Sequence, residues 1–432
     1  MTKTVGFAVL ASILFTTGVA HAGGYDTPML YTARHMGMGG TAIANVNDGS
    51  ALFHNPAGLG NIQRANIIGN FSLLLGNIQS APAAPGENVE SNLTVAPFPL
   101  LGGGVRLHEW VTLGLAVYPV ASAGATYEYP NSAGVPIEDS TSLLFIEASP
   151  GVALSVPESV GIGKLNIGVG YRVTFVSLDR QQLQEGLSPQ RIDFSMTGFN
   201  FASFRAGIQW QPIPELQLGF VYRHKTVTEI TNDDGQMGTS DGVAFLMEFD
   251  DISSEFTLPA KLGFGVRGNY ERLGVAVDLE YTLNSQNERS VLQGTPVAGG
   301  AEAAVANVFR WEDAVTLRLG GEYDIPLGAS QEENLITPRL GFVFDAQTGN
   351  PRFPTAFGTP PGPTYVFTGG VGYDGGPWEV NVAYAYRRGS AEVTREDISE
   401  GNAIEACLFC SQRGDYEIEL HGIYADFSYD FE

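Results

Sequence analysis

Cys407 and Cys410 are the only cysteines of the chain, and two residues separate them. In an exported protein such a CxxC pair forms a local disulfide, because compartments outside the cytoplasm are oxidising. A redox-active pair needs a helix N-terminus in a βαβ setting, and the surrounding sequence offers neither. A structural zinc site needs four ligands, twice as many as one CxxC supplies. We therefore expect a local disulfide, with a redox motif as the alternative.

Five histidines follow the first 22 residues, and histidine is a common general base and metal ligand. They are His35, His54, His108, His224 and His421. No serine or acidic residue lies at a spacing that would pair with them in a nucleophile–base set. The sequence also contains no recognisable metal-binding or phosphate-binding motif. It therefore predicts neither an enzyme nor a bound cofactor.

The N-terminal residues have the composition of a secretory signal. Lys3 supplies positive charge, Val5–Val19 is a short apolar run, and residues 20–22 (AHA) form a small-x-small cleavage site. The run is short for a membrane-spanning helix, and no later run is long and apolar enough to be one. We expect residues 1–22 to be a signal peptide, with a retained N-terminal anchor as the alternative.

Composition narrows the class of protein. The formal net charge is -24, which disfavours nucleic acid as a partner. Charged residues make up 16% of the chain, below the roughly 25% of soluble domains, while glycines number 54 and aromatics reach 11%. These values fit a transmembrane β-barrel, but they also fit an exported soluble β-protein.

Apolar and polar residues alternate with period two in many segments, as in strands with two different faces. In Arg272–Thr282, for example, apolar residues and Tyr281 alternate with a polar set that includes Asp278 and Glu280. An arginine facing lipid near the bilayer midplane costs about 2–4 kcal/mol, so a membrane barrel must keep its arginines on the inner face. The following arginines all fall on the polar side of their segments: Arg106, Arg172, Arg205, Arg223, Arg267, Arg318, Arg339 and Arg387.

We predict fourteen strands joined alternately by short turns and long loops. Their ranges are 66–75, 92–107, 110–124, 141–156, 164–179, 197–211, 215–227, 253–269, 272–285, 311–324, 335–346, 364–374, 377–390 and 413–431. This alternation is typical of an up-and-down outer-membrane barrel, and a soluble sandwich gives no reason for it. A change of apolar parity in the last strand predicts a bulge near His421–Gly422. We therefore expect an all-β transmembrane barrel over residues 65–432, in the outer membrane of a Gram-negative bacterium.

A glycine-rich segment, Gly37–Leu59, lies between the signal and the first strand. It contains the motif Asn55-Pro56-Ala57-Gly58-Leu59. The segment is too short to be a domain, so we expect residues 23–64 to form a hatch, or plug, inside the lumen. Together with Leu258–Gly263 at the start of a strand and Gly369–Tyr373 after a proline-rich loop, this order of elements resembles the FadL family of long-chain fatty acid and hydrocarbon transporters.

The resemblance implies passive uptake of hydrophobic molecules, either long-chain fatty acids or aromatic and aliphatic hydrocarbons. It implies that external loops capture the substrate, and that a kink in the third strand lets it leave sideways into the membrane. It also implies a monomer whose partners are the substrate, outer-membrane lipids and the barrel insertion machinery. A general porin or a structural barrel without hydrophobic specificity is the alternative function.

The third strand is regular over Val111–Val117 and then meets Pro119, which lacks the N–H that a strand residue donates. We expect the lateral opening at this kink, formed by Pro119, Val120, Ala121 and Gly124. The alternative is that the strand ends there in its loop. A sideways exit would keep an apolar molecule out of periplasmic water.

A cluster of apolar residues lies within the predicted long loop Thr226–Ser253. Its members Phe245, Leu246 and Phe249 either capture substrate or pack on one another. The inner-face arginines, together with acidic residues such as Asp278 and Asp345, are expected to form a hydrogen-bonded network that holds the plug.

Overall fold

The computed structural model describes residues 25–26, 28–29, 32–82, 86–130, 134–157, 160–184, 190–232, 249–296, 302–328, 334–407 and 410–431. The predicted signal over residues 1–22 lies outside these residues. The helices are α1 (Ala33–Met36), α2 (Ala51–His54) and α3 (Arg395–Ile404), with 3₁₀ turns η1 (Pro56–Asn61) and η3 (Asn284–Gln286). The strands are β1 (Ala65–Ser80), β2 (Val89–Glu90), β3 (Thr94–His108), β4 (Val111–Pro130), β5 (Pro136–Val156), β6 (Lys164–Gln184), β7 (Gln190–Ile213), β8 (Leu216–Arg223), β9 (Thr226–Asn232), β10 (Phe249–Leu258), β11 (Lys261–Tyr270), β12 (Leu273–Thr282), β13 (Arg289–Pro296), β14 (Ala303–Val308), β15 (Ala314–Tyr323), β16 (Ile325–Pro326), β17 (Leu335–Asp345), β18 (Thr364–Asp374), β19 (Trp378–Val393) and β20 (Gly414–Phe431).

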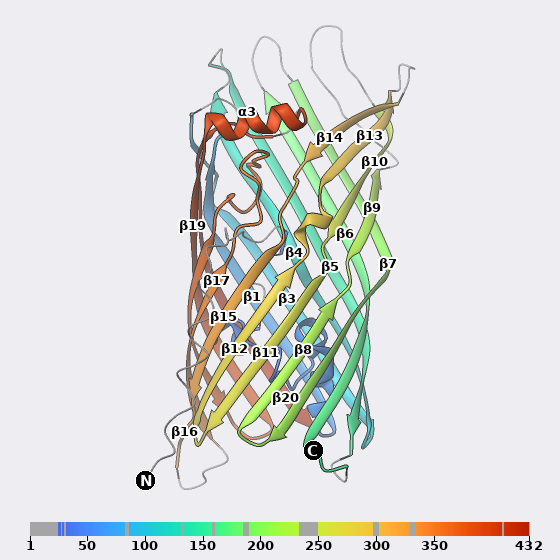
Figure 1. Cartoon of the computed structure of the whole chain (residues 1–432), viewed down its shortest axis with the longest axis vertical. Helices are drawn as coiled ribbons and strands as arrows, with labels where there is room; N and C mark the ends of the chain where they lie inside the picture. Colours follow the sequence, from blue (N-terminus) through green and yellow to red (C-terminus); the bar gives the residue numbers. More distant parts are fainter. Residues whose placement is uncertain are drawn as a thin grey trace.

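The described strands form one closed antiparallel barrel with fourteen strand positions, as the sequence predicted (Figure 1). β1 pairs with β3 on one side and with β20 on the other, which closes the sheet. Four positions hold two consecutive strands separated by a bend, namely β8–β9, β10–β11, β12–β13 and β14–β15. Because a closed barrel has no edge strand, its backbone groups can pair with one another inside a bilayer.

Alternation sets the two faces of the wall as expected. Along β12 the exposed positions carry residues such as Val275 and Leu279, whereas Asp278 and Glu280 are buried in the lumen. Exposed aromatic and aliphatic side chains cover the outside of the other strands in the same way. The apolar face of the strands therefore points toward lipid.

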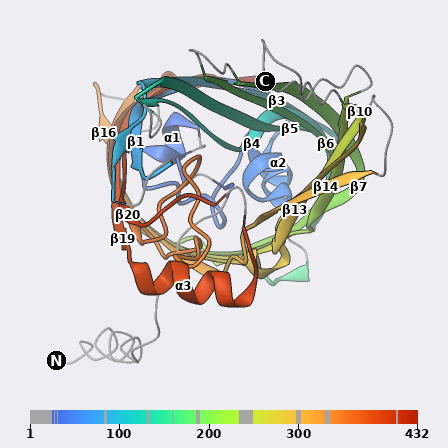
Figure 2. The ribbon, with the colours of Figure 1, turned by 90° about the horizontal axis from the view of Figure 1, so that it is seen from above.

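The N-terminal segment lies inside the barrel. Figure 2 shows α1 and α2 within the ring of strands. We call residues 32–62 the plug. The plug and its neighbours contribute many of the buried apolar side chains, so the core of this protein fills the lumen.

Two expectations about strands are wrong. The alternative that the third strand ends after Val117 fails, because β4 continues through Pro119 to Pro130 while paired with β5. The bulge near His421–Gly422 is also contradicted, because β20 pairs residue by residue through this point with both neighbours. The apolar parity changes there because Ile418 points into an apolar part of the lumen, and a local kink is not needed.

α3 lies along one side of the rim at one end of the barrel (Figures 1 and 2). α3 begins with a capping box, in which the Thr394 side chain accepts a hydrogen bond from the Asp397 N–H and Asp397 accepts one from the Thr394 N–H. Within the described part of the chain, no helix is long and apolar enough to cross a membrane.

Candidate functional site

The motif residues Asn55, Pro56 and Ala57 form the start of η1 within the plug. Asn55 is the N-cap, and its Oδ1 accepts a hydrogen bond from the Ala57 N–H at 3.2 Å. Pro56 lies in the first turn of η1, where a missing N–H is tolerated. The Nδ2 of Asn55 donates to the carbonyl of Ile43 at 2.8 Å and so connects two parts of the plug.

Asn55 also joins the plug to the wall of the barrel. Its amide donates to the carbonyl oxygens of Ile208 at 3.1 Å and Phe220 at 3.3 Å. This approach requires a glycine in the wall, because a Cβ at Gly207 would lie 1.9 Å from the Asn55 Oδ1. The other motif residues are buried as well: Pro56, Ala57, Gly58 and Leu59.

Inward-facing charged residues bind the backbone of the plug. Asp278 accepts hydrogen bonds from the N–H groups of Ala42 at 2.7 Å and Ile43 at 3.0 Å. Arg318 donates to the carbonyl of Gly39 at 3.3 Å. These contacts confirm the expected network for this part of the lumen, and ionised partners make such hydrogen bonds strong.

The residues that precede the plug reach up to the kink of β4. The Asp26 carboxylate accepts hydrogen bonds from the Arg223 guanidinium at 2.8 and 2.6 Å, and Lys261 Nζ lies 3.2 Å away. Burial alone would raise the pKa of Asp26, but the two cations outweigh it and hold that pKa below its usual range. The carbonyl of Tyr25 accepts a hydrogen bond from the Ser122 N–H at 3.2 Å. The chain is therefore fixed between the kink and two cations.

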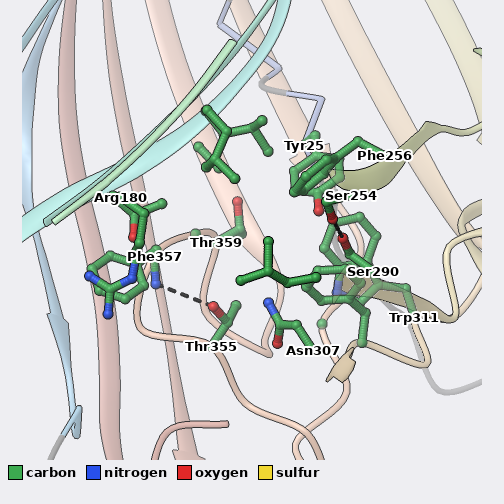
Figure 3. A pocket seen from close by; sticks show the side chains of 18 of the residues that line it. Tyr25, Arg180, Ser254, Phe256, Ser290, Asn307, Trp311, Thr355, Phe357 and Thr359 are labelled. Atoms are coloured by element: carbon green, nitrogen blue, oxygen red, sulfur yellow. Dashed lines mark hydrogen bonds between the residues drawn. The ribbon is translucent and has the colours of Figure 1, made fainter. Parts of the chain in front are cut away.

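A cavity of about 180 Å³ lies between the Tyr25 ring and the inward-folded loop 346–363 (Figure 3). The ring centroid of Tyr25 is 4.7 Å from that of Trp311 and 6.1 Å from that of Phe256. The aromatic residues that line the cavity are Tyr25, Phe194, Phe256, Phe309, Trp311 and Phe357. A concave, mostly apolar cavity with a few polar groups is the usual form of a small-molecule site.

Loop 346–363 carries Phe357 into this cavity. The Tyr127 hydroxyl donates to the Ala356 carbonyl at 2.5 Å, and the Tyr127 and Phe357 rings meet edge to face. Arg387 donates to Thr359 at 3.3 Å, also in this loop. Arg387 also lies 3.7 Å from the Asp345 carboxylate, as the expected arginine–acid network requires, and it supports this loop.

The ladder between β3 and β4 is interrupted. β3 pairs with β4 only from Leu101 to His108, although residues 86–130 are all described. Above Val117, β4 pairs with β5 alone until the Asn92 N–H donates to the Thr126 carbonyl at 2.7 Å. Opposite Ile146 and Phe145 of β5, β4 also carries an extra residue between Pro119 and Ala121, which is a bulge at Val120. The wall therefore has an unpaired stretch at the predicted kink.

Phe53 of the plug lies behind this stretch. A small hollow of about 10 Å³ is lined by Phe53, Phe98, Tyr118 and Pro119 among others. A polar cavity of about 50 Å³ is also lined by Phe53, together with Val120 and charged residues of the network. The Phe53 and Tyr118 rings pack edge to face with centroids 5.0 Å apart. Phe53 therefore borders both the unpaired stretch of the wall and the polar cavity in the lumen.

Comparison with known proteins gives a consistent result. The profile of the family described as "Outer membrane protein transport protein (OMPP1/FadL/TodX)" matches residues 13–431. The chain belongs to this family. A search of curated proteins found no match.

Solved structures of other family members share the fold of this OMPP1/FadL/TodX protein. A FadL homologue of Pseudomonas aeruginosa is 17% identical with a TM-score of 0.70, covering 95% of this chain and 100% of its own. The toluene transporter TodX of P. putida is 16% identical with a TM-score of 0.67, covering 94% and 100%. The toluene transporter TbuX of Ralstonia pickettii is 18% identical with a TM-score of 0.66, again covering 94% and 100%.

Membership places this protein among outer-membrane transport channels of Gram-negative bacteria, which are not enzymes. The long loops then face the outside of the cell and the short turns face the periplasm. Loop 346–363, which borders the cavity, lies near the outer mouth, and the plug lies below it (Figure 1).

The structure describes only some of the remaining residues that the sequence analysis singled out. The expected loop Thr226–Ser253 is shorter than predicted, because its ends belong to β9 and β10, and Phe249 begins β10. Phe245 and Leu246 lie outside the described residues, and for Phe249 only the backbone is described. Their role in substrate capture therefore stays a prediction. Cys407 and Cys410 follow α3 at the outer mouth, and the structure joins them in a disulfide.

The residues that line the cavity of this protein were not predicted from the sequence. Three of these residues face inward near the outer ends of long strands. Leu143 and Leu178 lie close to the predicted strand limits, and Phe194 lies beyond the predicted start of its strand. The available signal was apolar residues on both faces of the outer half of a strand. Tyr25 was missed because nothing near it in the chain indicates a binding site.

We predict that acid loosens the plug through His35. Burial, with the neighbouring Arg34 adding to it, lowers the pKa of His35 to about 3, and its Nδ1–H donates to the Thr41 carbonyl at 3.0 Å. Because the folded pKa lies below the unfolded value of about 6.5, the docked plug loses stability as the pH falls below that value, by about 2 kcal/mol at pH 5. Bilayer conductance of the purified protein should therefore rise between pH 7.5 and pH 5.

The variant His35→Asn keeps an N–H that can reach the Thr41 carbonyl but cannot take up the proton. It should show a smaller rise in conductance at pH 5. His421→Asn is the matched control. It removes a histidine of β20 that bonds to Tyr384, and it should behave as the wild type. An identical acid response in both variants would show that His35 is not responsible.

Proposed function

We propose that this protein takes up hydrophobic molecules passively and releases them sideways, through the wall between β3 and β4, into the outer membrane. Long-chain fatty acids and aromatic or aliphatic hydrocarbons are the candidate substrates. Related channels of the family are named for toluene and for monoaromatic hydrocarbons.

The single observation that carries the lateral exit is the interrupted ladder at Pro119. Unpaired backbone in a membrane barrel is costly, so a wall that leaves it unpaired is expected to serve a purpose. The stretch lies behind Phe53 and close to the aromatic cavity, whose lining includes Ala123 of the same strand. We expect the substrate to pass from the cavity along Ala123 to this stretch of the wall.

The plug argues for a sideways exit and against a general porin. Asn55, Asp278 and Arg318 tie its backbone to the barrel below the cavity. A molecule that continued downward would have to displace these bonds and then enter water, which is unfavourable for an apolar solute. Release into the bilayer avoids both costs.

The remaining parts of the proposal concern partners. The exposed aliphatic and aromatic belt of the barrel suits lipid as the acceptor of the substrate. We expect the aromatic strand β20 to be the element that the insertion machinery handles. We also expect the barrel to act as a monomer, as other channels of its family do.

Uptake by cells tests the proposal directly. Cells that lack this protein should take up alkylbenzenes or oleate more slowly than cells that express it, and the purified barrel should conduct ions poorly. Normal uptake without the protein, together with free conduction of ions by the purified barrel, would instead identify a general porin.

Removing the kink should lower uptake several-fold while the barrel remains folded. Deletion of Val120 together with Pro119→Val restores regular pairing opposite Phe145 and Ile146 and returns an N–H to the strand. The measurement is alkylbenzene uptake, with heat-modifiable migration on gels as the check of folding. Pro150→Val, a proline of β5 opposite Leu115, is the control and should leave uptake unchanged. Full uptake by the regularised strand would remove the kink from the mechanism.

A further inference from the structure

The aromatic cavity contains one charged side chain. Of the described residues that line it, Arg180 alone carries a charge, and the others are apolar, aromatic, hydroxyl or amide side chains or glycines. A lone cation in an apolar cavity would attract a carboxylate such as that of a fatty acid. Whether it can do so depends on what else holds Arg180.

The positive charge of Arg180 is already matched. Its Nη1 donates to a carboxylate oxygen of Asp139, and also to the carbonyls of Ser140 at 2.9 Å and Gln181 at 2.8 Å. Its guanidinium carbon lies 5.1 Å from the centroid of the Phe357 ring, on the face of loop 346–363. Figure 3 shows Arg180 against Phe357 at one side of the cavity. The arginine is therefore held at the wall by an anion, two carbonyls and a ring.

Asp139 is part of the wall and is buried from water. It is 4% exposed, and its second oxygen accepts hydrogen bonds from the Tyr129 hydroxyl at 2.9 Å and from Gln182 at 3.4 Å. These donors and Arg180 together hold the Asp139 carboxylate in place at the wall of the cavity. An incoming carboxylate would therefore be a second anion beside a single cation, in apolar surroundings where an uncompensated charge is costly.

The opposite wall of the cavity offers neutral hydrogen-bonding groups. The Oγ atoms of Ser254 and Ser290 are 2.7 Å apart, so one hydroxyl donates a hydrogen bond to the other. The accepting hydroxyl can then donate its own proton to a ligand in the cavity. Asn307 lines the cavity beside them, next to the Trp311 ring (Figure 3). These groups suit a molecule with an aromatic body and at most an uncharged polar group.

We propose that Asp139, acting through Arg180, is the specificity-determining residue of this cavity and makes it select uncharged, ring-bearing molecules over carboxylates. The inference rests on the proposed function, because it assumes that the cavity receives the substrate. It narrows the substrate class to neutral aromatic compounds and disfavours free fatty acids.

A matched pair of probes separates charge from shape. 3-Phenylpropan-1-ol and 3-phenylpropanoate share their ring and chain length, and at pH 7.5 only the second is charged. Trp311 reports binding, because it lines the cavity and is 8% exposed, whereas Trp110, Trp210 and Trp378 are at least 37% exposed on the outside. A protein in which these three are replaced by phenylalanine gives a fluorescence titration of the cavity alone.

The alcohol should bind about tenfold more tightly than the carboxylate. The reason is that burying one uncompensated charge costs about as much binding free energy as a tenfold change in affinity. Asp139→Asn keeps the shape of the side chain and frees the charge of Arg180, so carboxylate affinity should rise about tenfold while alcohol affinity changes little. Asp179→Asn is the matched control: it removes the same charge from the β6 residue that precedes Arg180. The Asp179 side chain is exposed and bonds to Ser195, so this change should alter neither affinity.

Arg180→Gln provides a second test that does not depend on Asp139→Asn folding. It leaves the Asp139 anion without its cation, so the carboxylate should bind still more weakly than in the wild type. Equal wild-type affinities for the two probes, or equal effects of Asp139→Asn and Asp179→Asn, would overturn the specificity proposal and leave the uptake function standing. Failure of both probes to bind the wild-type cavity would overturn the uptake site as well.

Discussion

Replacing Asn55 with leucine should turn this protein into a leaky barrel. The substitution removes the two amide protons that bond to the carbonyls of Ile43, Ile208 and Phe220, together with the N-cap of η1. At about 1 kcal/mol for each proton and for the cap, the docked plug loses about 3 kcal/mol, or more than a hundredfold in its docked population. The leucine also leaves the Ile43 carbonyl without this donor inside the lumen.

The leak is measured as single-channel conductance and as sensitivity of cells to a large antibiotic such as vancomycin. Gly207→Val should give the same result from the other side of the contact, because its Cβ would occupy the space of the Asn55 Oδ1. Asn47→Leu is the matched control, since Asn47 is an exposed plug residue that bonds to Arg34. A tight barrel in both Asn55→Leu and Gly207→Val would show that the plug is held by other contacts.

Replacing Glu147 with leucine should destabilise the barrel by about 3–5 kcal/mol, the usual cost of removing one partner from a buried ion pair. Glu147 is fully buried on β5, pairs with Arg172, and lies 3.8 Å from the Arg205 guanidinium. Arg205 donates to the Leu52 carbonyl at 2.5 Å and to the Tyr118 hydroxyl at 3.1 Å, so the same charges support the plug and the kinked strand.

Urea unfolding in lipid vesicles, followed by tryptophan fluorescence, measures this loss. Glu138→Leu removes an exposed carboxylate from the same strand and should change stability little. The double variant Glu147→Leu with Arg172→Met should be more stable than Glu147→Leu alone, because it no longer buries that unpaired arginine. If the double variant is the less stable one, unbalanced charge is not the cause of the loss.

The strands of the barrel could be predicted because the pattern that defines each strand lies within that strand's own residues. An arginine such as Arg172 or Arg318 falls on one parity of its strand, and the same parity then fixes every neighbour on that face. The alternation of short and long connections adds the direction of each strand. Most strand positions followed from these two regularities, although the ends of long strands such as β7 extend beyond the predicted limits.

The candidate site was only partly predictable. Asn55 could be recognised as a helix cap followed by proline, and it caps η1. Pro119 could be recognised as a proline inside a strand, and it lies beside the bulge of β4. The bulge expected at His421–Gly422 was wrong because parity was assumed to separate apolar outside from polar inside. That rule fails in the outer half of the barrel, where the lumen itself is apolar.

The sequence by itself determined which residues of each strand share a face, that a capped glycine-rich segment precedes the strands, and that the chain forms a membrane barrel. Only the tertiary structure decided what the lumen contains. It brought Tyr25 against Trp311, left β3 and β4 unpaired beside Phe53, and joined Arg180 to Asp139. The physical reason is that alternation is imposed by the pleat of one strand, whereas a cavity and its charge balance depend on contacts between strands that are distant in the sequence.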